Sequence, residues 1–167
     1  MTSNIRPAQT GDIPALTEIY NHYVRETSIT FDIEPKSIAE RTEWFGHYLL
    51  NTRHQLWVAE LDKNVVGYAS SSKFREKDAY QTSVETTIYL SPDANGLGLG
   101  TQLYEALFAA LQDQDVHQAF AGITLPNEPS QALHRKFGFQ TIGTFSQVGR
   151  KFDQYWDVEW LQRAVKL

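Results

Sequence analysis

The chain has 167 residues, of which 41% are hydrophobic and 21% charged, and this balance predicts one soluble domain over 1–167. The formal net charge of −5 disfavours nucleic acid as a partner, and the absence of cysteine excludes thiol nucleophiles, disulfides and cysteine metal sites. No apolar run approaches the roughly 20 residues of a membrane-spanning helix, and the N-terminal stretch MTSNIRPAQTGD has no apolar core. We therefore expect a cytoplasmic protein that does not associate with a membrane.

The first third of the chain predicts a strand over 4–8 and two helices. Asp12 offers an N-cap for the first helix, which has Pro14 in its first turn and apolar residues at three- and four-residue spacing through Tyr23. After a loop over 27–35, Ser37 and Glu40 form a capping box that predicts the start of the second helix. Its expected apolar face consists of Ile38, Trp44, Phe45 and Tyr48.

The rest of the chain predicts a mixed α and β pattern. Leucines at four-residue intervals from Leu99 to Leu111 indicate a helix, and a shorter helix has Pro129 in its first turn and Gly138 at its left-handed cap. The expected strands are a hairpin of 55–61 and 65–72 around the turn 62–64, then 83–90, 118–125, 139–146 and 152–161. The hairpin is antiparallel, whereas the strand–loop–helix–strand unit from 83 to 125 predicts a right-handed parallel crossover, so we expect a mixed sheet.

A glycine-rich loop, SPDANGLGLG, lies between a predicted strand and a predicted helix. Glycines at every second residue and a helix N-terminus suit an anion such as a pyrophosphate. A phosphate-binding NTPase loop would need lysine before Thr101, where Gly100 stands. The dinucleotide motif needs a different glycine spacing and an acidic residue about 20 positions later. A turn that binds no ligand stays open from the loop alone.

The stretch SPDANGLGLGTQLYEAL resembles the acetyl-CoA loop of the GNAT superfamily of N-acetyltransferases, whose pattern is Gln/Arg-x-x-Gly-x-Gly/Ala. Gly98 and Gly100 occupy the small positions, and Asn95 stands where Gln or Arg is usual. Four segments resemble the phosphinothricin and methionine sulfoximine N-acetyltransferase branch: IYNHYVRETSITFDIEP, VETTIYLSP, LPNEPSQALHRKFGF and VGRKFDQYWDV. The resemblance implies the α+β GNAT fold, a largely antiparallel mixed sheet of six to seven strands with helices on both faces.

The resemblance also implies acetyl-CoA as cosubstrate, with no metal. The residues it assigns to acetyl-CoA lie on the strand end, the glycine loop and the short helix: Ile88, Tyr89, Leu90, Asn95, Gly96, Leu97, Gly98, Leu99, Gly100, Thr101, Asn127 and Ser130. Asn127 and Ser130 also suit a helix cap, and the two uses are compatible.

Transfer of an acetyl group to a protonated amine needs a base, and Glu85 is the candidate because the resemblance assigns that role to the glutamate of VETTIYL. From the sequence alone, a solvated glutamate on an outer strand is the more common explanation, and only the resemblance favours a catalytic role. His134 is the candidate acid for the departing thiolate, although a lone histidine on a short helix is often structural. The resemblance further implies a backbone N–H near Leu90 for the thioester carbonyl.

The loop SKFREKDAYQ matches the branch's pattern of an aromatic residue, two basic residues and Ala-Tyr. Arg75 would bind a carboxylate with two parallel hydrogen bonds and Lys77 as a point charge. The resemblance assigns the acceptor to Phe31, Arg75, Lys77, Tyr80 and Thr87.

We therefore expect an N-acetyltransferase for a small amino acid analogue of the phosphinothricin, methionine sulfoximine or methionine sulfone type. Acetylation of peptide or protein N-termini, or of other small amines, is the alternative within the enzyme class, and a non-catalytic acyl-CoA sensor is the alternative outside it. The resemblance implies a homodimer through the terminal strands and SQVGRK, with Lys151 near the site. The histidines lack metal-ligand spacing and there is no GxSxG motif, which argues against metal and serine hydrolysis.

Overall fold

A computed structural model describes residues 1–166, and its seven strands form one sheet in the order β1-β2-β3-β4-β5-β7-β6. Only β4 and β5 pair in parallel among these strands, so the expected mixed and largely antiparallel sheet is confirmed. The strands are β1 (Ser3–Pro7), β2 (Leu56–Leu61), β3 (Asn64–Lys73), β4 (Ser83–Leu90), β5 (Gln118–Thr124), β6 (Gln140–Lys151) and β7 (Gln154–Ala164).

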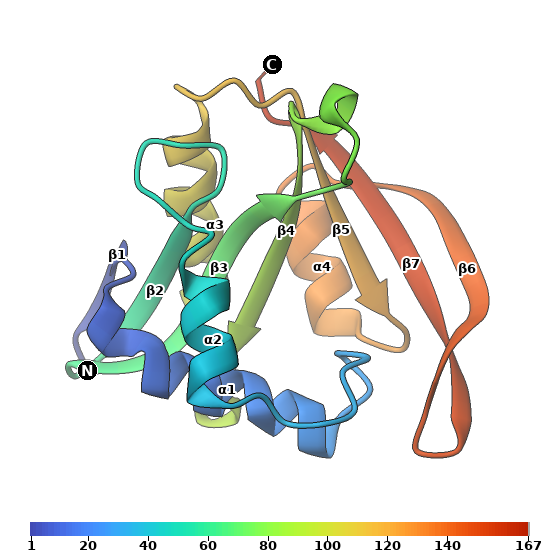
Figure 1. Ribbon diagram of the computed structural model, residues 1–167, viewed down its shortest axis with the longest axis horizontal. Coiled ribbons are helices and arrows are strands. Elements are labelled where there is room, and N and C mark those ends of the chain that lie inside the picture. The colour runs from blue at the N-terminus through green and yellow to red at the C-terminus, as the bar shows by residue number, and fades with distance from the viewer. Residues whose placement is uncertain (167) are drawn as a thin grey trace.

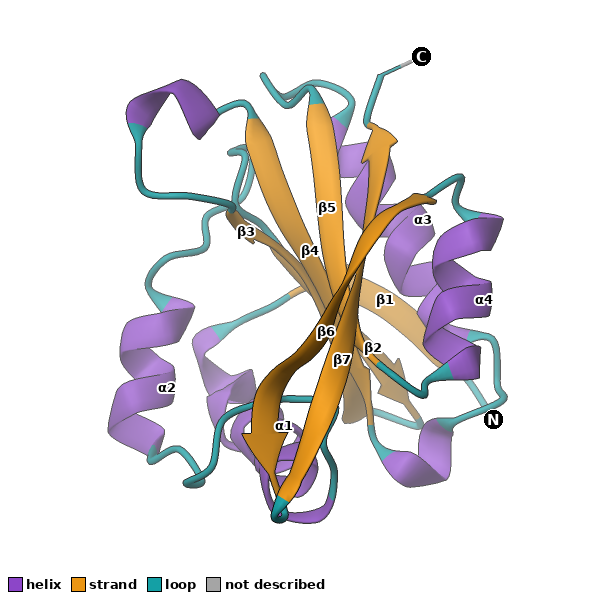
Figure 2. Cartoon of the chain, turned by 90° about the vertical axis from the view of Figure 1, so that its right-hand side faces the viewer, coloured by secondary structure: helices purple, strands orange, loops and turns teal. Residues whose placement is uncertain are grey.

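Helices cover both faces of the sheet, as Figure 2 shows. They are α1 (Ile13–Glu26), α2 (Ile38–Phe45), α3 (Leu99–Leu111) and α4 (Glu128–Lys136). The leucine stripe of α3 is buried against one face, together with Ala59 and Ala69 of β2 and β3. Leu16 and Ile19 of α1 pack on the other face, against Val58 of β2. Alternation along β2 and β3 therefore supplies apolar side chains to two separate cores. No helix within 1–166 is both long and apolar enough to cross a membrane.

The helix signals read from the sequence are mostly confirmed at the level of single hydrogen bonds. Ser37 and Glu40 form the capping box, with the Glu40 N–H donating to Ser37 Oγ (3.2 Å) and the Ser37 N–H donating to Glu40 Oε2 (2.7 Å). Tyr48, expected on this helix, lies beyond its end at Phe45 but still packs on the core under α1. Gly138 has φ +81°, as the left-handed cap requires.

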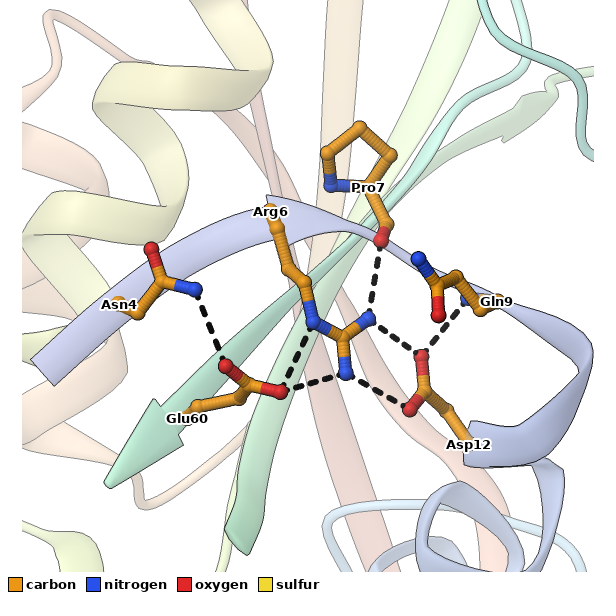
Figure 3. A network of polar contacts seen from close by, with 6 residues as sticks. All are labelled: Asn4, Arg6, Pro7, Gln9, Asp12 and Glu60. Carbon is orange, nitrogen blue, oxygen red and sulfur yellow. Dashed lines mark hydrogen bonds and ion pairs between the residues drawn. The ribbon is translucent and has the colours of Figure 1, made fainter. Parts of the chain in front are cut away.

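Asp12 is the N-cap residue of α1, as expected, but its side chain does not make the expected capping hydrogen bond to that helix. The helix begins at Ile13 without a side-chain cap, because the Asp12 carboxylate is held by Arg6 (Figure 3). Arg6 Nη1 and Nη2 donate to the two carboxylate oxygens of Asp12 at 2.8 and 2.9 Å, and Nε donates to Glu60 Oε1 at 2.8 Å. This network ties the start of α1 to β1 and β2. Burial alone would raise the pKa of Asp12, but the hydrogen bonds and charge of Arg6 outweigh it and lower the pKa.

The crossover from β4 through α3 to β5 leaves these two parallel strands paired over only three positions. Residues 83–85 pair with 118–120, and beyond Glu85 and Phe120 no further pairs form. Figure 1 shows the two strands together at the top of the view and apart at the bottom. The second half of β4 therefore has a neighbour, β3, on one side only.

We expect Asp12→Asn to lower the free energy of unfolding by about 1–3 kcal/mol at pH 7, because the part-buried Arg6 loses one of its two charged partners and keeps only Glu60. The folded-state pKa of Asp12 lies below its ordinary value of 3.8, so this stabilisation is present above that pH and is lost as pH falls through the folded pKa. Urea unfolding at decreasing pH measures the difference. Glu18→Gln removes an exposed ion pair with Arg25 and serves as the control with little effect. A pH-independent difference for Asp12→Asn would contradict this account.

Candidate active site

The separation of β4 from β5 opens onto a cleft of about 700 Å³ that continues to the glycine loop. The cleft is bounded by the end of β4, the starts of α3 and α4, and α1. Of the residues that the sequence assigned to acetyl-CoA, the structure brings all but one to this cleft; Leu97 is the exception and is 42% exposed. Cleft-lining residues that the sequence did not single out are His22, Tyr23, Thr27, Ile29, Pro92, Pro129 and Leu133.

The glycine loop has the backbone that the cleft requires. Gly96 and Gly98 have φ +78° and +75°, in the left-handed region that favours glycine. Gly98 is the N-cap of α3 and provides no side-chain cap, so the first N–H groups of the helix remain available to a ligand in the cleft. Gly100 serves packing instead: a Cβ there would lie 3.3 Å from Leu133 Cδ2 and 3.6 Å from Ile88 Cδ1. This arrangement suits a diphosphate.

The unpaired edge of β4 adds backbone donors to the same cleft. The Ser91 N–H, just past the end of β4, donates to the Val66 carbonyl of β3 at 2.7 Å. Successive N–H groups along a strand alternate in direction, so those of Ile88 and Leu90 point the other way, into the gap beside β5. The Tyr23 hydroxyl donates to the Leu90 carbonyl and fixes the end of the strand. An extended ligand with amide carbonyls could therefore pair with β4 in place of a strand.

Glu85 lies where β4 leaves β5, at a half-buried position. Its carboxylate has no hydrogen-bond partner within residues 1–166, which leaves its oxygens available to a substrate or water. Burial raises the pKa of the Glu85 carboxyl, and the positive charge of Arg75 opposes part of that shift. A carboxylate with a raised pKa beside a cleft has the properties of a general base.

Residues 16–139 match the model of the Acetyltransferase (GNAT) family. The chain belongs to the GNAT family of acetyltransferases. It is 50% identical over 163 residues to a phosphinothricin N-acetyltransferase of Streptomyces coelicolor, covering 96% of this chain and 95% of the relative. It is 33% identical over 162 residues to an L-methionine sulfoximine/L-methionine sulfone acetyltransferase of Pseudomonas aeruginosa, covering 97% and 94%.

Solved structures show the same relationship. A Salmonella typhimurium acetyltransferase determined with its cofactor acetyl-CoA has a TM-score of 0.93 at 32% identity, covering 99% of this chain and 95% of that one. A GNAT superfamily phosphinothricin acetyltransferase of Sinorhizobium meliloti, in complex with acetyl-CoA, has a TM-score of 0.90 at 35% identity, covering 98% and 89%. The expected GNAT fold and the acetyltransferase class are confirmed.

In this GNAT acetyltransferase His134 is buried at 3% exposure, and both of its ring nitrogens have partners. Nδ1 lies 2.7 Å from the Ser130 carbonyl, which can only accept, so Nδ1 carries the proton and donates it. Nε2 then accepts from the Tyr104 hydroxyl at 2.8 Å. Burial lowers the pKa of His134, which favours this neutral form. Service as the general acid would require these hydrogen bonds to rearrange.

The residues expected to bind the acceptor are only partly brought together. Thr87 lines a second cavity, of about 400 Å³, on the face of the sheet covered by α1 and α2. Arg75 and Lys77 are exposed and line a separate hollow, although the charge of Arg75 acts on Glu85. Tyr80 is 45% exposed and contacts the Phe74 ring edge to face. Phe31 packs directly over Gly149, where any Cβ would collide with its ring.

The sequence interpretation missed most of the second cavity. The remaining residues that line it come from α1, α2, β3, β4 and the loops after α1 and α2: Tyr20, Asp32, Lys36, Glu40, Arg41, Trp44, Tyr48, Tyr68, Ser70, Ser72 and Tyr89. A usable signal was present in β3, where Tyr68, Ser70 and Ser72 alternate as polar residues on one face. No comparable signal marked Arg41, since an arginine on a helix is usually solvated.

Proposed function

We propose that the protein transfers the acetyl group of acetyl-CoA to the primary amine of a small amino acid analogue of the phosphinothricin, methionine sulfoximine or methionine sulfone type. The names of the relatives that match nearly its whole length support this substrate class. The observation that carries the proposal is the position of Glu85, an unpartnered half-buried carboxylate at the point where the strands part.

Each part of the site has a chemical task in this proposal. The bound thioester supplies an activated acetyl group. The amides from Asn95 to Thr101 hold its diphosphate, and the Ile88 and Leu90 N–H groups bind carbonyl oxygens of the extended arm and the thioester. Glu85 accepts the proton of the acceptor ammonium, directly or through a water, so that the neutral amine can attack. Arg75 and Lys77 attract the acceptor carboxylate, and Phe31 forms a wall of the acceptor site.

Glu85→Gln is expected to lower kcat by at least about 100-fold while acetyl-CoA affinity stays close to that of the wild type. In the wild type, kcat/KM should fall at acidic pH as Glu85 becomes protonated, at a pH above the ordinary value of 4.5 for glutamate because burial raises the pKa of Glu85. The variant should lack this acidic limb. An unchanged pH profile would remove Glu85 from the mechanism.

The assay measures thiol release from acetyl-CoA with phosphinothricin, methionine sulfoximine and methionine sulfone. Release only with peptides or other small amines would favour the alternative acetyltransferase. Absence of release with every amine would favour an acyl-CoA sensor.

We also propose a homodimer formed through β6 and β7. β6 is an edge strand, and all of its twelve residues except Gly149 and Lys151 are exposed. Apolar side chains that are more than half exposed cluster on this hairpin: Ile142, Phe145, Val148, Phe152 and Tyr155. A long exposed edge with an apolar surface favours association with a second copy.

Light scattering at micromolar concentration is expected to give the mass of a dimer, and Val148→Glu should shift it toward the monomer because a charge would be buried at the interface. A monomeric wild type would contradict the dimer.

A further inference from the structure

The second cavity contains a buried arginine that the reaction described above does not use. Arg41 lies on α2, is 5% exposed and lines the cavity of about 400 Å³ under α1 and α2. Its guanidinium carbon lies 3.5 Å from the centre of the Trp44 ring and 4.6 Å from that of Tyr20. These cation–π contacts help to stabilise its charge.

The N–H groups of this guanidinium have few hydrogen-bond acceptors within residues 1–166. Nη2 donates to the Tyr68 hydroxyl at 3.3 Å, and this is the one hydrogen bond that Arg41 side-chain nitrogens make within residues 1–166. Nε is fully buried without a partner. Stacking on aromatic rings cannot satisfy in-plane N–H groups, and leaving a buried charged donor unpaired is costly. The arrangement therefore favours an acceptor that enters the cavity from outside the chain.

The other charged groups of the cavity do not compensate Arg41. Asp32 accepts from the Tyr20 hydroxyl and lies 3.5 Å from Lys36 Nζ. Glu40 is engaged by the backbone of Ser37 in the capping box. No carboxylate of the described chain lies within ion-pair distance of Arg41. Its positive charge therefore lacks an ion-pair partner, unlike the charge of Lys36 in the same cavity.

The cavity extends from Arg41 toward the reaction centre. Ser72 lines it and pairs in register with Glu85, while Tyr68, which binds Arg41, pairs with Tyr89. Paired residues of neighbouring strands point to the same face, so the cavity runs along the face that carries Glu85. The Ser72–Glu85 pair and the Tyr68–Tyr89 pair are four residues apart along the strands, which is about 13 Å. Thr87, which lines the cavity, lies midway between the two pairs, about 7 Å from each. A small amino acid with its amine beside Thr87 would reach Glu85 through a water and extend its side chain toward Arg41.

We propose that Arg41 binds an oxyanion at the far end of the acceptor's side chain. The protein then prefers α-amino acids whose side chains end in a phosphinate, phosphonate or carboxylate over those that end in a neutral sulfone. This inference rests on the proposed function and names the substrate class of the same site. A planar guanidinium matches such an oxyanion with two parallel hydrogen bonds.

The test compares kcat/KM for phosphinothricin with kcat/KM for methionine sulfone in wild type, Arg41→Met and Arg41→Lys. Arg41→Met retains an apolar side chain against Trp44 but removes the charge. Its ratio of phosphinothricin to sulfone activity is expected to fall at least tenfold, mainly through the KM for phosphinothricin, and Arg41→Lys should recover part of the ratio. Arg25→Met, on the exposed ion pair of α1, is the matched control and should leave the ratio unchanged.

Melting temperature and acetyl-CoA affinity identify a variant that has lost its fold. An unchanged ratio in a folded Arg41→Met, or equal losses on both acceptors, would overturn the proposal. Calorimetric titration of phosphinothricin separates this result from failure of the proposed function, because it needs no turnover. A wild type that releases no thiol yet binds phosphinothricin, with at least tenfold weaker binding in Arg41→Met, would refute the reaction and support the role of Arg41. Equal binding by both proteins, or none by either, would refute that role.

Discussion

The site depends on the short pairing of two parallel strands. β4 and β5 are joined over three positions by backbone hydrogen bonds, and beyond them β4 has a partner on one side only. Backbone N–H groups inside a protein normally find partners, so an interior strand edge left open is a strong constraint on what must lie beside it. The direction of the Ile88 and Leu90 amides, the position of Glu85 and the approach of α3 all follow from this parting of the strands.

The two faces of the sheet carry different groups of the candidate site. On one face, Gly100 lets the start of α3 come close to β4, and Gly98 provides the left-handed N-cap from which the helix presents backbone donors for an anionic cosubstrate. On the other face, Tyr68, Tyr89 and Trp44 enclose a cavity with hydroxyl groups and one uncommitted guanidinium. β4 contributes to both faces because its side chains alternate, and Glu85 lies on the same face as this cavity, beside the gap. Donor and acceptor can therefore meet across a single strand.

The sequence predicted the features that local patterns determine. Leucines at four-residue spacing gave the bounds of α3, and the Ser37–Glu40 pair gave the start of α2, because both depend on neighbours within a few residues. Asp12 occupies the N-cap of α1 but makes no capping hydrogen bond, because Arg6 on β1 and the Gln9 N–H bind its carboxylate instead. β6 extends to Lys151, well beyond the predicted 146, because its pairing with β7 resumes at Gly149 after an irregular stretch.

The candidate site likewise has parts that depend on neighbouring residues and parts that depend on contacts between distant segments. The glycine loop is contiguous in sequence, so its place at the cleft could be predicted. The second cavity is assembled from four elements, and the burial of Arg41 depends on how α2 lies over β3, which no local pattern encodes. The resemblance assigned Arg75, Lys77 and Thr87 to one acceptor site. Arg75 and Lys77 lie on the exposed loop that follows the strand end at Lys73 and line a hollow of their own, whereas Thr87 lines the second cavity.

The most direct test of the central claim is calorimetric titration of acetyl-CoA into the wild type, Gly98→Ala and Gly138→Ala. Both glycines have left-handed φ values, +75° and +81°, and neither has a neighbour within 4 Å of an added Cβ, so the two substitutions impose similar backbone strain. We predict clear binding by the wild type, at least tenfold weaker binding by Gly98→Ala, and little change for Gly138→Ala. Absence of binding heat in the wild type, or equal weakening in both variants, would contradict a backbone cradle for the cosubstrate at the start of α3.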